Sequence, residues 1–268
     1  MIGPSVHDAL VALARVTSEP TGVLLDDADV ARFTNVRTLL TDVLAGLRQI
    51  VRHGGTAWLD ATPLPPEARN LATSMLNQGE ITIRVEDAQG LTRMSETALQ
   101  GIWLVDGPDR QGIEIGDVPA LVRSRSAQGV PSVVIPDEAD LPPGCMNVRS
   151  VLAEIAYHQA LALAGTPVAG DHEINLTLLP VTPQDHQVLE QSLGKGGIDI
   201  LASGYGGCQI MGCALAKVWR VRYFNSEGKM ILDMIHVGDV PVAAKATPED
   251  MADSTTRLEE LIAAYFPG

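Results

Sequence analysis

The chain is poor in the features that would indicate several common classes of protein. It has three cysteines in 268 residues, too few for the disulfide framework of a small secreted protein. Glu154 and His158 interrupt its best apolar stretch, VLAEIAYHQALALAG, so we expect no membrane insertion. The N-terminus lacks the basic segment and clean apolar run of a secretory leader. These absences predict a cytoplasmic protein with reduced thiols.

Basic residues and catalytic motifs are also scarce. Lys and Arg number 19 against 33 Asp and Glu, which gives a formal charge of −14. A nucleic-acid-binding protein gathers Lys and Arg on one face to displace counterions, so we expect no nucleic-acid partner. No serine lies in a GxSxG elbow and no HExxH occurs. We therefore expect neither an enzyme nor a cofactor, and the acidic balance favours a basic partner.

What the chain does contain is an internal similarity. NVRTLLTDV at 35–43 resembles NVRSVLAEI at 147–155, and Asn35 and Asn147 are predicted helix N-caps because Asn can accept a bond from a free backbone N–H. Each segment precedes a predicted short strand, a helix that begins at a proline, and another strand. Strands around Trp103 and Trp219 follow, and both tryptophans are predicted core anchors. IEIGDVP at 113–119 then matches IHVGDVP at 235–241, and four matches in one order predict a duplication.

The predicted fold class is α+β, with two related units. Each unit has helices on a small, mainly antiparallel sheet, in the order helix–strand–helix–strand–strand–strand. Asn225 and Gly228 in the turn NSEG predict a hairpin, because both tolerate positive φ. The expected parts are an N-terminal extension 1–33, a first repeat 34–130, a Pro-rich connector 131–145, a second repeat 146–250 and a C-terminal helix 251–268.

The second half carries a glycine-rich loop, SGYGGCQIMGC, at 203–213. Its counterpart in the first half, VEDAQGLTRMSE, has one glycine and no cysteine, so the second-half loop is the better candidate for a specialised function. A phosphate-binding loop is disfavoured, because the pattern is not a P-loop and no helix is predicted directly after the glycines. Cys208 and Cys213 could supply two thiolates, with Cys145 or a histidine completing a metal site. Packing of these cysteines as small apolar side chains is the favoured interpretation.

A set of histidines and an aspartate is a weaker candidate for a functional site than the glycine-rich loop. His172 lies in DHEIN, and Asp185 and His186 lie in TPQDH. Asp185 is better explained by the first turn of a helix that starts near Pro183, where a carboxylate suits the helix dipole. His186 beside it is then expected to face solvent.

Several motifs together carry a family resemblance. They are the H-x-x-N-L-x-L-L-P segment, the Leu-Gly-x-Gly turn, the S-x-GYG-x-C loop, the W-x-V-x-YFN strand and the E-D-x-x-x-S-x-x-R helix. This region resembles the C-terminal region of the hydrogenase expression/formation accessory proteins of the HupH/HyaF/HoxQ family. LPPEAR, GIW and NVRSVLAEI extend the resemblance over most of the chain. Two positions depart from the family pattern: Cys213 lies where Thr is expected, and His236 where an acidic residue is usual.

The resemblance implies a non-catalytic chaperone in the maturation of an uptake nickel–iron hydrogenase. Such a protein binds the iron–sulfur small-subunit precursor before export by the twin-arginine route, with other hydrogenase accessory proteins as further partners. The acidic charge fits a basic leader. One alternative is a metal or iron–sulfur carrier that uses Cys208 with Cys213 or Cys145, and another is a thiol redox catalyst that uses Cys208. The predicted partner-binding residues are Ser203, Gly204, Tyr205, Gly206 and Cys208.

Overall fold

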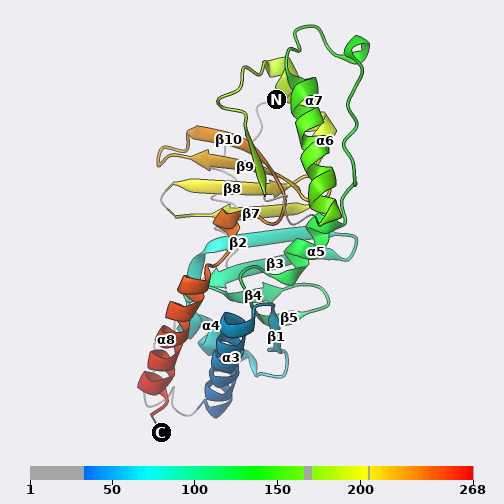
Figure 1. The fold of residues 1–268 in the computed structure, drawn as a ribbon. Coiled ribbons are helices and arrows are strands. Elements are labelled where there is room, and N and C mark those ends of the chain that lie inside the picture. The colour runs from blue at the N-terminus through cyan, green and yellow to red at the C-terminus, as the bar shows by residue number, and fades with distance from the viewer. Residues whose placement is uncertain (1–32, 166–170, 205, 268) are drawn as a thin grey trace.

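The computed structural model describes residues 33–165, 171–204 and 206–267. Of the expected N-terminal extension, only Phe33 falls within these residues, and Tyr205 lies outside them. A single sheet runs through the described structure, with most of the helices at its two ends and one near its middle (Figure 1). None of the described helices is long and apolar enough to cross a membrane.

The first half contains three helices and five strands. The long helix α3 (Thr34–His53) buries the side chains that recur at helical spacing, and it stops at Gly54, whose φ of 71° favours glycine. The prediction for Asn35 is wrong, because the N-cap is Phe33 and Asn35 is the second helical residue; its Oδ1 accepts from the N–H of Val36. The elements that follow are β1 (Ala57–Asp60), α4 (Pro66–Leu76), β2 (Gln78–Asp87), β3 (Gly90–Thr97), β4 (Ile102–Asp106), β5 (Gln111–Ile115) and α5 (Ala120–Ala127).

The second half has the same order of a helix, a strand, a helix and four strands. Asn147 is at the N-cap position of its first helix as predicted, although its side chain donates to the carbonyl of Pro180 (2.6 Å) instead of capping. Each half therefore has one strand more than expected. The elements are α6 (Val148–Ala164), β6 (His172–Asn175), α7 (Pro183–Leu193), β7 (Ile198–Ala202), β8 (Gly207–Gly212), β9 (Val218–Phe224), β10 (Met230–Val237) and α8 (Pro248–Tyr265), with short 3-10 turns η1 (Glu138–Asp140) and η2 (Val242–Ala244).

The strands form one ten-stranded sheet in the order β1-β5-β4-β3-β2-β7-β8-β9-β10-β6, and every pairing is antiparallel. This confirms the α+β class and the antiparallel pairing but corrects the expectation of two small sheets. The halves join through β2 and β7, where Ile83 lies opposite Ile200. From the outer edge inward, the order is β1-β5-β4-β3-β2 in the first half and β6-β10-β9-β8-β7 in the second half. Equivalent strands of the two halves therefore occupy equivalent places in the sheet. Backbone hydrogen bonds therefore run unbroken from one half into the other.

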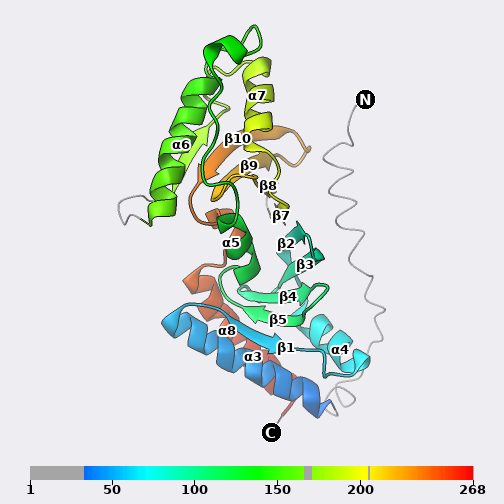
Figure 2. The ribbon, with the colours of Figure 1, turned by 90° about the vertical axis from the view of Figure 1, so that its right-hand side faces the viewer.

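The helices cover the sheet in three apolar clusters. One cluster packs α3, α4 and α8 on the first half, and another packs α6 and α7 on the second half. The third lies under α5 and η2 at the centre and contains both Trp103 and Trp219, which are fully buried. Figure 2 shows α3 and α8 together at one end of the sheet and α6 and α7 at the other.

The C-terminal helix crosses back to the first half. It begins at Pro248, three residues before the expected start at 251, and it packs along α3 (Figures 1 and 2). Leu258 and Phe266 join the apolar cluster of the first half, and Arg48 pairs with Glu259 at the surface. The last described helix thus packs against α3, an arrangement that links the two halves a second time.

Candidate functional site

The glycine-rich loop connects β7 to β8 and lies at the ends of these two central strands. Ser203 and Gly204 are exposed, whereas Gly206 and Gly207 are half-buried. The N–H and the hydroxyl of Ser203 both donate to the carbonyl of Glu80, at 2.9 and 3.0 Å, so the loop is tied to the start of β2 in the other half. Ser203 is therefore fixed to β2, while the surfaces of Ser203 and Gly204 are accessible to a partner.

Glycine is required at one place in this loop. Gly206 has a φ of 84°, and a Cβ at this position would collide with the carbonyl oxygen of Phe224. Gly207 then opens β8 directly opposite Phe224, the last residue of β9. The backbone of Gly206 therefore packs directly against the backbone at the end of β9, with no room for a side chain between them.

The hairpin beside the loop adds exposed apolar side chains. Asn225 organises its turn, because the Asn225 Oδ1 accepts from the N–H groups of Glu227 (3.0 Å) and Lys229 (2.9 Å). Met230 and Ile231, which open β10, are 47% and 56% exposed. We call the exposed surface of Glu80, Ser203, Gly204, Glu227, Met230 and Ile231 the loop rim. It combines acidic, small and apolar groups at the ends of neighbouring strands.

Cys208 is predicted as a partner contact, and it lies beneath the loop rather than on it. The side chain points into the central apolar cluster and is buried. Burial raises the pKa of the thiol to about 11, although the nearby hydroxyl of Tyr223 opposes the shift. The thiol is therefore protonated at neutral pH, which is the unreactive form.

Cys208 lies in a different apolar cluster from the other two cysteines. Cys213 belongs to the apolar cluster under α6 and α7, and burial raises the pKa of its thiol to about 12. Cys145 packs at the margin of that cluster, and burial followed by the charge of Asp185 raises its pKa. Among the described residues, no group of three metal-ligand side chains includes a cysteine.

The acids near the loop rim are close enough to influence one another. Glu96, in β3, is 2% exposed, and its Oε1 accepts from the N–H of Gly101 at 3.4 Å. Burial raises the pKa of Glu96 to about 7; this hydrogen bond opposes the shift, and the charges of Asp250 and Glu80 add to it. A second buried acid, Glu114, accepts from the N–H of Ala120 at 2.8 Å and so fixes the start of α5.

Glu96 gives the fold a pH dependence that can be measured. Its pKa is raised from 4.5, so the folded state keeps a proton that the unfolded chain releases, and stability falls as the pH rises through this window. We expect the free energy of unfolding to drop by roughly 2–3 kcal/mol between about pH 4.5 and 7 on this account. Urea unfolding of Glu96→Gln should lack most of this drop, while Glu86→Gln on the exposed part of β2 should keep it. An identical drop in both variants would exclude Glu96 as the cause.

The two G-D-V-P motifs meet at a second site. Asp117 and Asp239 are their aspartates, and Arg123 of α5 contacts both, with two hydrogen bonds to Asp117 (2.9 and 2.6 Å) and a 3.2 Å contact to Asp239. Burial of Asp239 would raise its pKa, but hydrogen bonds from Arg123, the Val240 N–H and Lys245 lower it to about 2. This network holds the halves together in the charged form at neutral pH.

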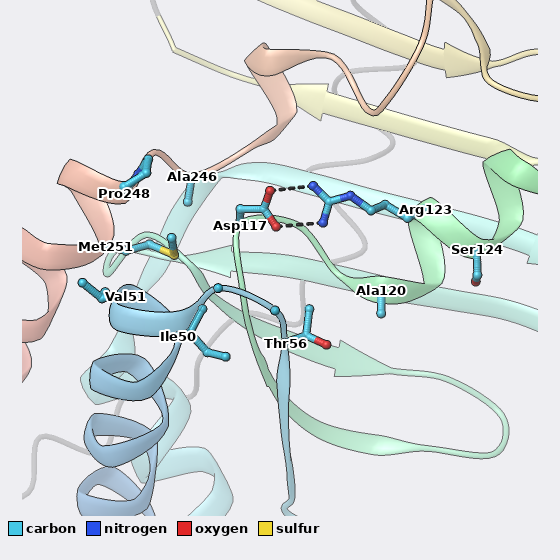
Figure 3. Close-up of a pocket in the computed structure, with 12 residues that line it drawn as sticks. Ile50, Val51, Thr56, Asp117, Ala120, Arg123, Ser124, Ala246, Pro248 and Met251 are labelled. Atoms are coloured by element: carbon cyan, nitrogen blue, oxygen red, sulfur yellow. Dashed lines mark hydrogen bonds and ion pairs between the residues drawn. The ribbon is translucent and has the colours of Figure 1, made fainter. Parts of the chain in front are cut away.

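A cavity of about 760 Å³ lies beside this network. Figure 3 shows the Asp117–Arg123 pair at its upper wall and the apolar side chains of Ile50, Val51 and Met251 on the other side. The cavity lies where the end of α3, the start of α5 and the start of α8 come together. Its lining comes from the first half and from residues 246–251 at the start of the C-terminal helix.

Comparison with known proteins identifies the family. The family described as "HupH hydrogenase expression protein, C-terminal conserved region" matches residues 33–141 and again 145–265. The chain belongs to the HupH family. The resemblance drawn from the motifs is thereby confirmed, and membership supports an accessory role in hydrogenase expression and formation. The family matches each half of the chain separately.

Curated relatives cover most of the chain. HoxQ of Cupriavidus necator, a hydrogenase expression/formation protein, is 34% identical over 90% of this chain and 85% of its own length. HupH of Rhodobacter capsulatus, also a hydrogenase expression/formation protein, is 35% identical over 88% of this chain and 83% of its own length. The hydrogenase-1 operon protein HyaF of Escherichia coli is 29% identical over 76% of this chain and 71% of its own length. A solved structure of a hydrogenase expression protein HupH from Thiobacillus denitrificans covers 44% of this chain and 95% of its own, with 28% identity and a TM-score of 0.40.

Proposed function

We propose that this protein is a non-catalytic chaperone that binds the iron–sulfur small-subunit precursor of a nickel–iron hydrogenase in the cytoplasm, before export. The observation that carries the proposal is the loop rim. In a member of the HupH family, exposed residues of a glycine loop between two central strands lie beside exposed acids and exposed apolar side chains. A binding surface of this composition needs no catalytic group.

The chemistry of the rim suits an export leader. Such leaders carry a basic segment followed by an apolar run. Glu80 and Glu227 on the rim offer carboxylates to the basic segment, and Met230 and Ile231 offer apolar contact to the run that follows. The formal charge of −14 draws a basic segment toward the protein over longer distances.

We infer that the two halves arose by duplication and that the second copy acquired the client-binding loop. Support comes from the separate match of the family to each half and from the equal strand order of the halves. The first-half turn between β2 and β3 has two residues, Ala88 and Gln89, and lacks the extra glycines.

The cysteine carrier is the less favoured alternative. It requires Cys208 to present a thiolate with Cys213 or Cys145, whereas Cys208 and Cys213 are buried in separate apolar clusters. Both thiols have pKa values raised by burial to about 11 and about 12. Opening the fold at two places would be needed before these thiols could share an ion.

The proposal predicts co-purification with the precursor. We expect tagged small-subunit precursor to retain the wild-type protein, and we expect retention to fall on the order of tenfold for the double variant Glu80→Lys/Glu227→Lys, because two attractive charges become repulsive. The measurement is the bound fraction at low salt, with the precursor in full and without its leader. Adding salt should weaken wild-type binding, since exposed charges are screened.

A matched variant separates the rim from net charge. Asp42→Lys/Glu260→Lys makes the same change in net charge at exposed positions on α3 and α8, and it should bind as the wild type does. Failure of the wild type to bind either form of the precursor would defeat the chaperone proposal. Equal loss in both double variants would leave the chaperone in place and remove the rim as its binding surface.

A further inference from the structure

A cluster of possible metal ligands lies away from the loop rim and the Arg123 network. Glu154 and His158 are four residues apart on α6, so they share one face of the helix. His172 is the first residue of β6, the outermost strand on that side of the sheet. The packing of α6 over β10 and its neighbour β6 brings the three side chains together.

The geometry of the cluster is compact. The rings of His158 and His172 are stacked, with centroids 3.4 Å apart and planes 2° from parallel. The Nε2 of His172 is 2.7 Å from the Oε1 of Glu154. One ligand atom from each of the three residues can be chosen so that all lie within 4.8 Å of one another, and this is the one such group among the described residues.

The core does not account for this arrangement. Neither histidine belongs to an apolar cluster, and the side chains of His172 and Glu154 are 29% and 44% exposed. Stacked imidazoles gain little from each other at a surface, and protonating both would place like charges face to face. The carboxylate hydrogen-bonded to His172 orients that ring, as carboxylates beside metal-binding histidines commonly do.

We propose that Glu154, His158 and His172 form a binding site for a divalent transition-metal ion of the zinc type. Two imidazoles and one carboxylate are a ligand set that zinc accepts, with a fourth position left for water or for a donor from another molecule. Nitrogen ligands at about 2.0–2.1 Å on a tetrahedral ion lie roughly 3.3 Å apart, and the ligand atoms of this cluster already lie within 4.8 Å of one another. The stacked rings hold their lone pairs in parallel planes, so binding requires the two side chains to rotate until one nitrogen of each ring points toward the ion.

The ligand set of the cluster distinguishes it from the cysteine sites. The site uses none of the three cysteines, and so it differs from the metal sites that the sequence indicates, all of which require Cys208.

The test is metal titration of the purified full-length protein after removal of metal with a chelator. We expect one Zn²⁺ to bind by calorimetry, and Co²⁺ to give visible absorption without the near-ultraviolet thiolate bands that a cysteine site would produce. His158→Ala and His172→Ala should each weaken Zn²⁺ binding on the order of 100-fold, and Glu154→Gln by at least about tenfold. Thermal unfolding of the metal-free variants checks that each still folds.

Two control variants make the result specific. His53→Ala removes a histidine at the end of α3, and Cys145→Ser removes the half-exposed thiol, so both should bind Zn²⁺ as the wild type does. Absence of stoichiometric Zn²⁺ binding by the wild type would overturn the proposal. So would unchanged affinity in the folded His158→Ala and His172→Ala variants, or thiolate bands in the Co²⁺ spectrum. None of these outcomes depends on binding of a hydrogenase precursor.

Discussion

Replacing Asp233 by leucine is expected to lower the free energy of unfolding by about 3–5 kcal/mol, because the change leaves a buried arginine without its counter-ion. Asp233 and Arg220 have side chains only 6% exposed. Two hydrogen bonds of 2.5 Å join them, one from Nε and one from Nη2 of the arginine. The Nε of Arg222 also lies 3.4 Å from the Asp233 carboxylate. Asp233 in β10 therefore forms ion pairs with two arginines of β9.

The double variant Arg220→Met/Asp233→Leu tests this reason. It should recover most of the lost stability, because neither charge is then left alone in the sheet. Arg48→Met, which breaks the exposed pair with Glu259, should cost no more than about 1 kcal/mol. Urea unfolding followed by circular dichroism gives all three values. A double variant as unstable as Asp233→Leu alone would show that packing, and not the unpaired charge, sets the cost.

Local patterns in the sequence predict much of this fold. Val36, Leu40, Val43 and Leu47 recur at the spacing of one helix face, which predicts α3. The structure confirms this, because all four side chains are fully buried. The burial of Cys208 also follows a local pattern, since Cys208, Ile210 and Gly212 alternate along β8 on its buried face. That alternation was available in the sequence and argues against a surface role for the thiol.

Contacts between distant segments explain what the sequence does not predict. The single sheet depends on β2 pairing with β7, and no local signal distinguishes this pairing from two separate sheets. The shared network of Asp117 and Asp239 also depends on Arg123, which lies outside the repeated motif. Glu154, His158 and His172 become neighbours only after α6 packs over the end of the sheet. The part of the loop rim in β10 needs the hairpin to be placed beside β8.

Asp185 shows how one side chain can replace a predicted cap. Its carboxylate accepts from the N–H groups of Met146 (2.9 Å) and Val148 (3.1 Å) at the start of α6, and from that of Thr182 (2.9 Å) at the start of α7. It therefore caps the start of α6 and completes the capping box of α7, whose N-cap is Thr182, and this explains why Asn147 makes no cap of its own. Ala68, the third residue of α4 as Asp185 is of α7, has no such role in the first half.

Asp185→Ala is expected to lower the free energy of unfolding by about 3–5 kcal/mol, because several buried or part-buried N–H groups lose their acceptor at once. Burial would raise the pKa of Asp185, but hydrogen bonds from Thr182, Met146 and Val148 outweigh it and lower the pKa. The contribution is therefore present above the ordinary pKa of 3.8 and is lost as the pH falls through the lower folded value.

The remaining variants separate the charge of Asp185 from its shape. Asp185→Asn keeps one acceptor oxygen and should lose less than alanine does, while Asp253→Ala on the exposed face of α8 should stay within about 0.5 kcal/mol of the wild type. Amide hydrogen exchange adds a local test, because faster exchange should appear in the first turns of α6 and α7 and not in α3. Uniformly faster exchange across all helices would mean that Asp185 stabilises the fold in general and is not the cap of these two helices.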